Sequence, residues 1–427
     1  MGIIFLSNKI RVYSAELKIG MYVAELDKPW VESPFLFQGF MIEGIDEINE
    51  LQEHCEYAYV DKERSRPDVA AKLLAFSYSP ASKKIVTRPR ITSKFTEANF
   101  RHSLLQSHKV YRDARSWIDT MLEDSRLGGS VDTETARVLV TRLADQVIQS
   151  PDALVWLTHL KLRDEYTAAH CINVCILSLT FGRALGIEEA PLHKLGMGAL
   201  LHDIGKMKVP DEILNKPGRL SKEEFEIMME HPSLGHAMLV DDYELDMESL
   251  HIILHHHERL DGGGYPDGLG EINIPLLTRI ASIVDVYDAI TSDRCYHDGV
   301  SPAQGLENLF KWSKGNFDVS LLEKFIKCLG IYPIGSVVRL TTGEVGVVVA
   351  TDADHRIKPI VLLAISAEGK AYLPRRLINL SSAVWEKTGA LIVIDEVLQP
   401  GSLGIDIRDI LLEELNYSEA HIADYEK

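Results

Sequence analysis

The sequence predicts a multi-domain protein built around an all-α core, with a small α+β domain before the core and a small β-rich extension after it. The length of 427 residues is enough for about three domains. Apolar residues recur at helical spacing from about residue 96 to residue 330, and β-branched runs lie on either side of that stretch. Of the 16 histidines, 11 lie between His159 and His297. Because neutral imidazole is the commonest metal ligand, the core is expected to carry a metal site.

The N-terminal part of the chain is predicted to form a small α+β domain over residues 1–76, with a regulatory or docking role. Residues 44–54 have the apolar spacing of a short helix, and residues 56–61 alternate like a half-buried strand. Residues 77–95 contain five Lys or Arg residues, two prolines and no acid, which is typical of a solvated basic linker.

The helical core is predicted over residues 96–331, with leading helices before the part that carries the candidate site. Asp132 or Thr133 is expected to begin one helix. Ser221 stands three residues before Glu224, which is the spacing of a capping box that begins another helix. Further helices are expected over residues 165–186, 190–207, 246–258 and 275–293.

The last part of the chain is predicted to form a β-rich extension over residues 332–400 and an acidic helical tail over residues 401–427. Residues 335–352 form two β-branched runs around Thr-Gly-Glu, which is a hairpin signal. The segments PIVLLAIS and AYLPRRLINL are expected to add two strands, so the extension is predicted to be a small barrel or a curled sheet.

Charge and composition exclude several classes of protein. The 45 Lys and Arg residues against 63 Asp and Glu residues give a formal net charge of −18, which repels polymeric DNA and RNA. No apolar run reaches the roughly 18–20 residues of a membrane span, and the N-terminus lacks the pattern of a secretory signal. The five cysteines form no CxxC motif, which favours reduced thiols and a cytoplasmic location.

The most informative short motif is LHDIGK. His202 and Asp203 are adjacent on an apolar stretch that is predicted to be helical, so their side chains are expected to project about 100° apart. A carboxylate in that position can bridge two cations while the imidazole binds one. Lys206 follows His202 by four residues and is expected on the same side, where its ammonium suits a phosphate oxygen. A structural hydrogen-bonded pair is the alternative for His202 and Asp203 taken alone.

A second group of polar residues follows another apolar helix. Three successive histidines, His255 to His257, are hard to explain as core packing. Glu258 and Asp261 are candidates to orient imidazoles through hydrogen bonds without binding the metal themselves. The glycines after Asp261 allow close approach of the backbone to a ligand. Further candidates are His170, in the polar stripe of an apolar helix, His231, at a helix end before a proline, and Asp285, an acid within an apolar pattern. Nitrogen and oxygen ligands without a thiolate suit Fe, Mn, Zn or Ni, and two such ions together hydrolyse phosphoesters.

These motifs together resemble the HD-GYP family, a branch of the HD superfamily of metal-dependent phosphohydrolases. The resemblance rests on LHDIGK, PDEIL, KPGRL, HHERLDGGGYPDGL and SIVDVYDAITSDR, in this order, and covers about residues 160–330. Residues 10–75 resemble the uncharacterised domain that often precedes HD-GYP in bacterial proteins. The β segment after Tyr332 resembles the extension that often follows HD-GYP.

The resemblance implies an HD-type helical core that hydrolyses cyclic dinucleotides. The expected reaction converts cyclic di-GMP to the linear dinucleotide pGpG, and in some members onward to GMP, in bacterial second-messenger signalling. Asp203, as the bridging ligand, and Lys206 are the implied catalytic residues. The implied metal ligands are His170, His202, Asp203, His231, His256, His257 and Asp285. The implied substrate-binding residues are Lys206, Arg294, Gly264, Tyr265 and Pro266.

The number of metals follows from a departure from the family pattern. In a trinuclear version of this site a Glu lies four residues before the first ligand histidine. Tyr166 stands there in this chain, and Glu165 is displaced by about 100° on a helix. We therefore expect two divalent metal ions, Fe or Mn first, with Zn and Ni as alternatives.

Three alternatives for the function remain open. The same chemistry could act on cyclic GMP–AMP or another phosphoester. The chain could instead be a catalytically weak module that binds cyclic di-GMP and signals, or an oxygenase, since some diiron proteins with an HD fold activate dioxygen. The position of Lys206 close to His202 and Asp203, the HD pair of the motif, weighs against an oxygenase. The GYP loop and the N-terminal domain are the expected surfaces for protein partners, and a homodimer is open.

Overall fold

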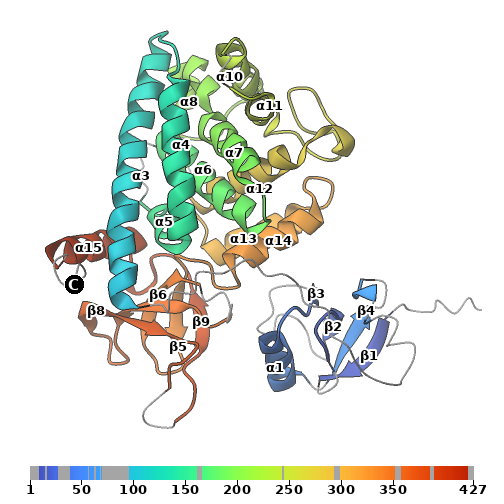
Figure 1. Cartoon of the computed structure of the whole chain (residues 1–427), viewed down its shortest axis with the longest axis vertical. Coiled ribbons are helices and arrows are strands. Elements are labelled where there is room, and N and C mark those ends of the chain that lie inside the picture. Colours follow the sequence, from blue (N-terminus) through green and yellow to red (C-terminus); the bar gives the residue numbers. More distant parts are fainter. Residues whose placement is uncertain are drawn as a thin grey trace, which may run out of the picture. The chain divides into compact units, whose positions relative to one another are not determined.

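The computed structural model divides the chain into two compact units, Met1–Lys94 and Phe95–Lys427 (Figure 1). None of the described helices is long and apolar enough to cross a bilayer. The predicted linker over residues 77–95 lies outside the described residues, as do Glu165 and Arg294. The structure describes residues 9–14, 17–26, 39–55, 57–61, 64–67, 69, 96–160, 166–242, 245–292, 299–351, 357–384 and 389–421.

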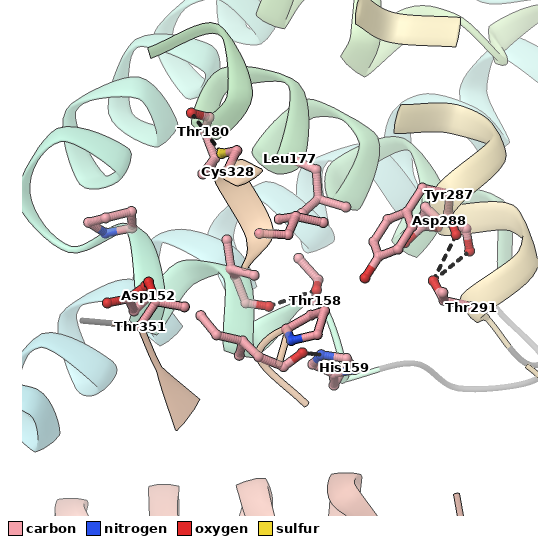
Figure 2. Close-up of a pocket in the computed structure, with 15 residues that line it drawn as sticks. Asp152, Thr158, His159, Leu177, Thr180, Tyr287, Asp288, Thr291, Cys328 and Thr351 are labelled. Atoms are coloured by element: carbon pink, nitrogen blue, oxygen red, sulfur yellow. Dashed lines mark hydrogen bonds between the residues drawn. The ribbon is translucent and has the colours of Figure 1, made fainter. Parts of the chain in front are cut away.

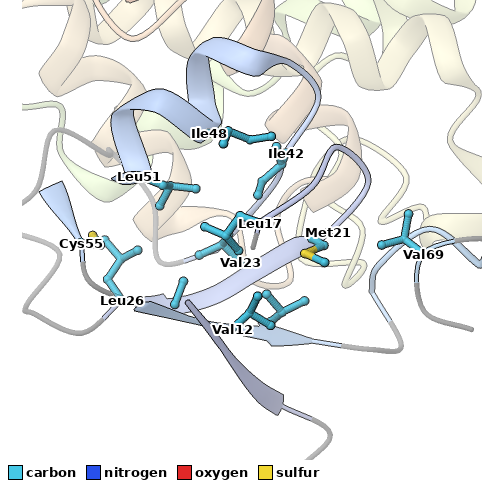
Figure 3. Packing of buried hydrophobic residues seen from close by; sticks show 12 residues of the cluster. Val12, Leu17, Met21, Val23, Leu26, Ile42, Ile48, Leu51, Cys55 and Val69 are labelled. Atoms are coloured by element: carbon cyan, nitrogen blue, oxygen red, sulfur yellow. The ribbon is translucent and has the colours of Figure 1, made fainter. Parts of the chain in front are cut away.

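In the described residues of the first unit, an antiparallel sheet packs against helix α1 (Ile45–His54). Helix α1 begins after Gly44 and directs Ile48 and Leu51 toward the sheet, where they pack with Val23 (Figure 3). One apolar face of the helix and one of the sheet therefore form a single core, and the small α+β region predicted here is confirmed. The strands are β1 (Lys9–Tyr13), β2 (Tyr22–Leu26), β3 (Phe40–Met41) and β4 (Tyr57–Asp61), in the order β1-β4-β2-β3.

The second unit begins with the helical core. Its central helices α6 and α7 are apolar over most of their lengths because they are covered on several sides, by each other and by α4 and α12. The described helices of the core are α3 (Glu97–Arg126), α4 (Thr133–Gln149), α5 (Pro151–Leu157), α6 (Tyr166–Ala184), α7 (Glu189–Leu201), η4 (Ile204–Lys208), α8 (Asp211–Leu214), α9 (Lys222–Met228), α10 (His231–Leu239), α11 (Met247–His255), η5 (Glu271–Asn273), α12 (Leu276–Thr291), α13 (Pro302–Trp312) and α14 (Val319–Leu329).

Two predicted helix starts are confirmed by their capping contacts. Ser221 Oγ accepts a hydrogen bond from the backbone amide of Glu224 at 3.2 Å, and the Glu224 carboxylate accepts one from the amide of Ser221 at 2.6 Å. Of the two candidates at the start of α4, Asp132 is the cap, because its Oδ1 accepts a hydrogen bond from the amide of Thr135 at 3.0 Å.

The helix that leads to the HD pair ends earlier than predicted. Helix α7 stops at Leu201, Asp203 leaves the helical region with φ −99° and ψ 6°, and the 3-10 helix η4 follows. The backbone at Gly205 lies so close to α10 that a Cβ atom there would overlap the carbonyl oxygen of His231. This close approach of two backbones requires the chain to turn after His202, so the prediction of one continuous helix is wrong.

The β-rich extension is a five-stranded antiparallel sheet in the order β8-β7-β6-β5-β9. The predicted hairpin and the two further strands are present. Strand β9 was not predicted, because Asp395 and Glu396 interrupt its apolar residues and are exposed. The strands are β5 (Val337–Leu340), β6 (Val345–Ala350), β7 (Ile360–Ile365), β8 (Ala371–Asn379) and β9 (Ile394–Leu398).

The acidic tail contains helix α15 (Ile407–Ala420), which packs on α3. The contact includes a buried ion pair in which Arg101 Nε lies 3.1 Å from Glu414 Oε2. The helical core, the α+β region before it and the β-rich sheet after it agree with the predicted fold class. The boundaries between these parts remain predictions.

Candidate metal centre and active site

Seven polar side chains from separate segments of the helical core meet in one place. Each segment is otherwise apolar and packs into the core, so the polar side chain is carried into the interior with it. Six of the seven are buried, and the side chain of His257 is 20% exposed. They are the predicted metal ligands: His170 in α6, His202 and Asp203 after α7, His231 at the start of α10, His256 and His257 after α11, and Asp285 in α12.

The nitrogen and oxygen atoms of these residues form two groups. In the first group, His170 Nε2 lies 3.0 Å from Asp285 Oδ1 and 3.3 Å from His202 Nε2. Three protein ligands around one point are the arrangement found at catalytic metal sites. The second group consists of His231, His256 and His257, whose ligand atoms lie within 4.8 Å of one another.

The carboxylate of Asp203 lies between the two groups. Its Oδ2 is 3.4 Å from His202 Nε2 and 3.6 Å from His170 Nε2. Its Oδ1 is 3.3 Å from His231 Nε2 and 3.9 Å from His256 Nε2. Asp203 Oδ1 is buried and has no hydrogen-bond partner in the part of the chain that the structure describes. The carboxylate is thus in position to contact one cation through each oxygen.

Three of the imidazoles are oriented by backbone carbonyls of the preceding turn. Their Nδ1 atoms donate to the carbonyl three residues earlier, so we assign the proton to Nδ1. The Nε2 atom is then unprotonated and faces the centre. Bare nitrogens and a buried carboxylate oxygen that face one another fit divalent cations between them. The pairs are His202 with Ala199 at 2.8 Å, His231 with Met228 at 2.8 Å and His256 with Ile253 at 3.0 Å.

His170 is oriented by a residue that sequence reasoning missed. Its Nδ1 lies 2.8 Å from Asp288 Oδ2, and its Nε2 faces Asp285. Asp288 follows Asp285 by three residues, so both carboxylates lie on one face of α12. This spacing was the signal available in the sequence.

Burial and neighbouring charges shift the pKa values of these groups in different directions. Burial, together with His202 and His231, holds the pKa of His256 well below its ordinary value. Burial alone would raise the pKa of Asp203, but the neighbouring imidazole of His202 and the ammonium of Lys206 hold it well below its usual range. Burial lowers the pKa of His170, whereas its hydrogen bonds to carboxylates outweigh this effect and raise it. A neutral imidazole at His256 and an ionised carboxylate at Asp203 are the forms that bind divalent cations.

Lys206 contacts the centre, but from a different backbone position than predicted. It was expected to share a helix face with His202, but the helix ends before it. Instead Lys206 lies in η4, three residues after Asp203, and its Nζ is 2.5 Å from Asp203 Oδ2. The Lys206 side chain is 18% exposed, whereas that of Asp203 is buried.

The predicted GYP loop lies against the second group of ligands. Gly264 packs on the backbone of residues 257–259, where a Cβ atom would overlap backbone atoms. Tyr265 stacks on His257 with ring centroids 4.7 Å apart and an interplanar angle of 30°, and Pro266 follows it. The loop therefore covers part of the centre.

Glu258 holds this loop and does not orient an imidazole. Its buried carboxylate accepts hydrogen bonds from the backbone amides of Asp267 at 2.8 Å and Leu269 at 2.9 Å. Asp261 Oδ1 accepts one from the amide of Gly263 at 2.9 Å. The prediction that Glu258 and Asp261 orient imidazoles is wrong, because both carboxylates accept hydrogen bonds from backbone amides of the loop instead.

Known families and characterised relatives match large parts of the chain. Residues 152–321 match the HD domain family, and residues 9–136 match a domain of unknown function, DUF3391. The chain is 36% identical to a cyclic di-GMP phosphodiesterase of Pseudomonas aeruginosa, over 87% of this chain and 89% of that protein.

Two further relatives match shorter segments. A cyclic di-GMP phosphodiesterase response regulator of Xanthomonas campestris is 34% identical over 39% of this chain and 45% of its own length. A 3′3′-cGAMP-specific phosphodiesterase of Vibrio cholerae is 32% identical over 45% of this chain and 35% of its own length.

Proposed function

Since the chain belongs to the HD-GYP family of metal-dependent phosphodiesterases, we propose that it hydrolyses cyclic di-GMP to the linear dinucleotide pGpG in bacterial signalling. The observation that carries the proposal is the position of Asp203 between two groups of imidazoles, with the ammonium of Lys206 on its Oδ2. Two divalent cations, Fe or Mn before Zn or Ni, complete the proposed site. His170, His202 and Asp285 would hold one cation, His231, His256 and His257 would hold the other, and the carboxylate of Asp203 would be a ligand common to both.

The reaction requires attack of water on a phosphodiester. When bound, the two cations supply Lewis acidity, which lowers the pKa of water and polarises the phosphate. A bond from water to phosphorus forms as the bond from phosphorus to the 3′-oxygen breaks, and the 3′-oxygen takes up a proton. Lys206 donates to a non-bridging phosphate oxygen and stabilises the charge that develops there. Gly264, Tyr265, Pro266 and Arg294 are the further residues that we propose to contact the dinucleotide.

Cyclic GMP–AMP is the second candidate substrate. It is favoured by the similarity to the Vibrio relative, which is named for that substrate. Cyclic di-GMP takes precedence because the Pseudomonas relative matches over most of both chains. The alternative of a catalytically weak binding module is disfavoured, since all seven proposed ligands are present and lie together.

The cellular setting and the partners are part of the proposal. The four cysteines that the structure describes are free thiols, which supports a reducing, cytoplasmic location. We propose the GYP loop and the N-terminal unit as the surfaces for protein partners, a second copy of the chain included.

Anaerobic purification with Fe or Mn, followed by product chromatography and metal analysis on the same sample, tests the function. Cyclic di-GMP and cyclic GMP–AMP are supplied in separate reactions. We expect pGpG from cyclic di-GMP and about two metals per chain. His202→Ala should abolish turnover, whereas His193→Ala, which alters an imidazole of α7 outside the two groups, should not.

The outcomes separate the candidates. Faster hydrolysis of cyclic GMP–AMP would favour the second substrate. Turnover without dioxygen excludes an oxygenase reaction. A filled metal site that hydrolyses neither dinucleotide would reject the phosphodiesterase proposal.

A further inference from the structure

His170 differs from the other buried imidazoles in what holds its Nδ1. The backbone acceptors of His202, His231 and His256 lie in the last turns of helices, where carbonyls have no amide partner within the helix. His170 lies one turn after the first residue of α6, where the carbonyls three and four residues before it are within the helix and accept backbone amides. Its orientation therefore depends on a side chain, the carboxylate of Asp288.

The other oxygen of Asp288 is held by Asn173. Asn173 follows His170 by three residues on α6 and is fully buried. Its Nδ2 donates to Asp288 Oδ1 at 3.2 Å and to the carbonyl of Thr158 at 3.0 Å. Both hydrogens of the carboxamide therefore have acceptors, one of which belongs to the turn after α5.

The carboxamide of Asn173 is fixed in one orientation. Tyr111, a buried residue of α3, donates its hydroxyl to Asn173 Oδ1 at 3.4 Å. Rotating the carboxamide by 180° would place its oxygen against the Thr158 carbonyl and the Asp288 carboxylate, two acceptors that have no hydrogen to donate to it. In the interior such unpaired polar contacts are costly, so the observed orientation is the stable one.

We propose that Asn173 is a positioning residue for the metal centre: it fixes Asp288, and Asp288 in turn keeps the proton of His170 on Nδ1 and leaves Nε2 for a cation. This inference rests on the metal site proposed above and adds to it a residue that touches neither metal nor substrate. Through Thr158 and Tyr111 it ties the first ligand group to α5 and α3.

Removal of the Asn173 carboxamide would take away one hydrogen bond to Asp288, and water could replace it. Thr158 and Asp288 both line a cavity of about 40 Å³ (Figure 2), which is large enough to hold water. In Asn173→Ala, water can solvate Asp288 Oδ1, and Ser292 Oγ still donates to Oδ2 at 3.2 Å. The carboxylate then loses the hydrogen bond that fixes its Oδ1, so His170 is oriented less firmly.

The test is the affinity of the purified full chain for Mn²⁺, measured by competition with a chelator. We expect Asn173→Ala and Asp288→Asn each to weaken Mn²⁺ binding about tenfold, as loss of outer partners of metal ligands does. Combining the two changes should weaken it no further, because both act through the same carboxylate. Ser178→Ala is the matched control: it lies on α6, is fully buried, and its hydroxyl has no hydrogen-bond partner among the described residues.

Melting temperatures of the metal-free variants separate positioning from folding. A purely structural role would lower the melting temperature and leave Mn²⁺ affinity unchanged, and that result overturns the inference. Additive effects of Asn173→Ala and Asp288→Asn would also overturn it. If Asn173→Ala fails to fold, Tyr111→Phe removes one hydroxyl only and should weaken Mn²⁺ binding by a smaller factor, about threefold. Failure of the unaltered chain to bind Mn²⁺ would instead reject the metal site itself.

Discussion

Lys206 Nζ lies 2.5 Å from Asp203 Oδ2, so the carboxylate that stands between two groups of imidazoles also forms an ion pair with a lysine. The carboxylate is buried and the lysine side chain is partly exposed. We propose that a phosphate approaches the centre on the side of Lys206. On arrival of a phosphate, its ammonium can move from one anionic oxygen to another over a short distance.

Lys206→Met is predicted to lower kcat by about 100-fold, because one donor to the charge that develops on phosphate is lost. The Mn²⁺ content should remain that of the unaltered chain, since lysine is no ligand. Product chromatography and metal analysis on one sample measure both quantities. Lys208→Met, which removes a neighbouring ammonium that donates to the carbonyl of Ser125, should keep turnover. Loss of Mn²⁺ together with activity would contradict the role given to Lys206.

Asp203→Asn is predicted to release metal as well as abolish turnover. The substitution keeps the size of the side chain and removes the charge that faces both ligand groups. We expect about one metal or fewer per chain after dialysis. Asp211→Asn is the control, because Asp211 is an exposed acid that pairs with Arg126. Retention of two metals by Asp203→Asn would show that Asp203 does not bridge them.

Glu258→Gln is predicted to loosen the GYP loop. A glutamine offers one oxygen to the two amides of Asp267 and Leu269, and its NH₂ group opposes the other amide. We expect hydrogen exchange of these two amides to rise about tenfold or more and KM for the dinucleotide to rise with it. Glu271→Gln, at an exposed position after the same loop, is the matched control. Unchanged exchange at residues 267 and 269 would rule out the anchoring role.

Asp152 gives a prediction about pH. It lies at the start of α5, and its Oδ1 accepts a hydrogen bond from Thr351 Oγ1 at 3.1 Å (Figure 2). Burial raises the pKa of Asp152 to about 6, although the hydrogen bonds from Thr351 act in the opposite direction. Between the unfolded value of 3.8 and about 6, the folded chain binds a proton that the unfolded chain lacks. The stability from the neutral carboxyl is complete below the unfolded value and is lost as pH rises through about 6.

Asp152→Asn should therefore stabilise the chain at neutral pH. We expect a gain of about 1 to 2 kcal/mol at pH 7.5, or a few degrees in Tm, and a smaller gain at about pH 5. Thermal melting at the two pH values measures the difference. Asp145→Asn, an exposed acid of α4, should show no such dependence. An equal effect of Asp152→Asn at both pH values would contradict the raised pKa.

The sequence predicted several ligand residues because they interrupt an apolar pattern. His170 and Asp285 stand in segments that must be buried for their neighbours to pack. A polar residue in such a segment needs partners in the interior. The resemblance to the HD-GYP family then implied that the seven candidates form one metal site.

The parts that were missed depend on tertiary contacts. The early end of α7 follows from the approach of Gly205 to α10, a segment about 30 residues later in the chain. Glu258 lies beside a ligand histidine in sequence, yet backbone amides nine and eleven residues later take up its carboxylate. Asp288 was overlooked because its partner, His170, is 118 positions away. The pattern of neighbouring residues in the sequence alone predicts none of these three features.

The carbonyl partners of His202, His231 and His256 bear on how the site can change during evolution. A main-chain oxygen is present whatever residue occupies positions 199, 228 and 253, so point substitutions there leave the tautomers of these imidazoles intact as long as the helix ends persist. His170, unlike these three, has a side chain, the carboxylate of Asp288, as the partner of its Nδ1, and a single nucleotide change can alter that side chain. Natural or selected variants that tune metal affinity without replacing a ligand are therefore expected to accumulate around Asp288.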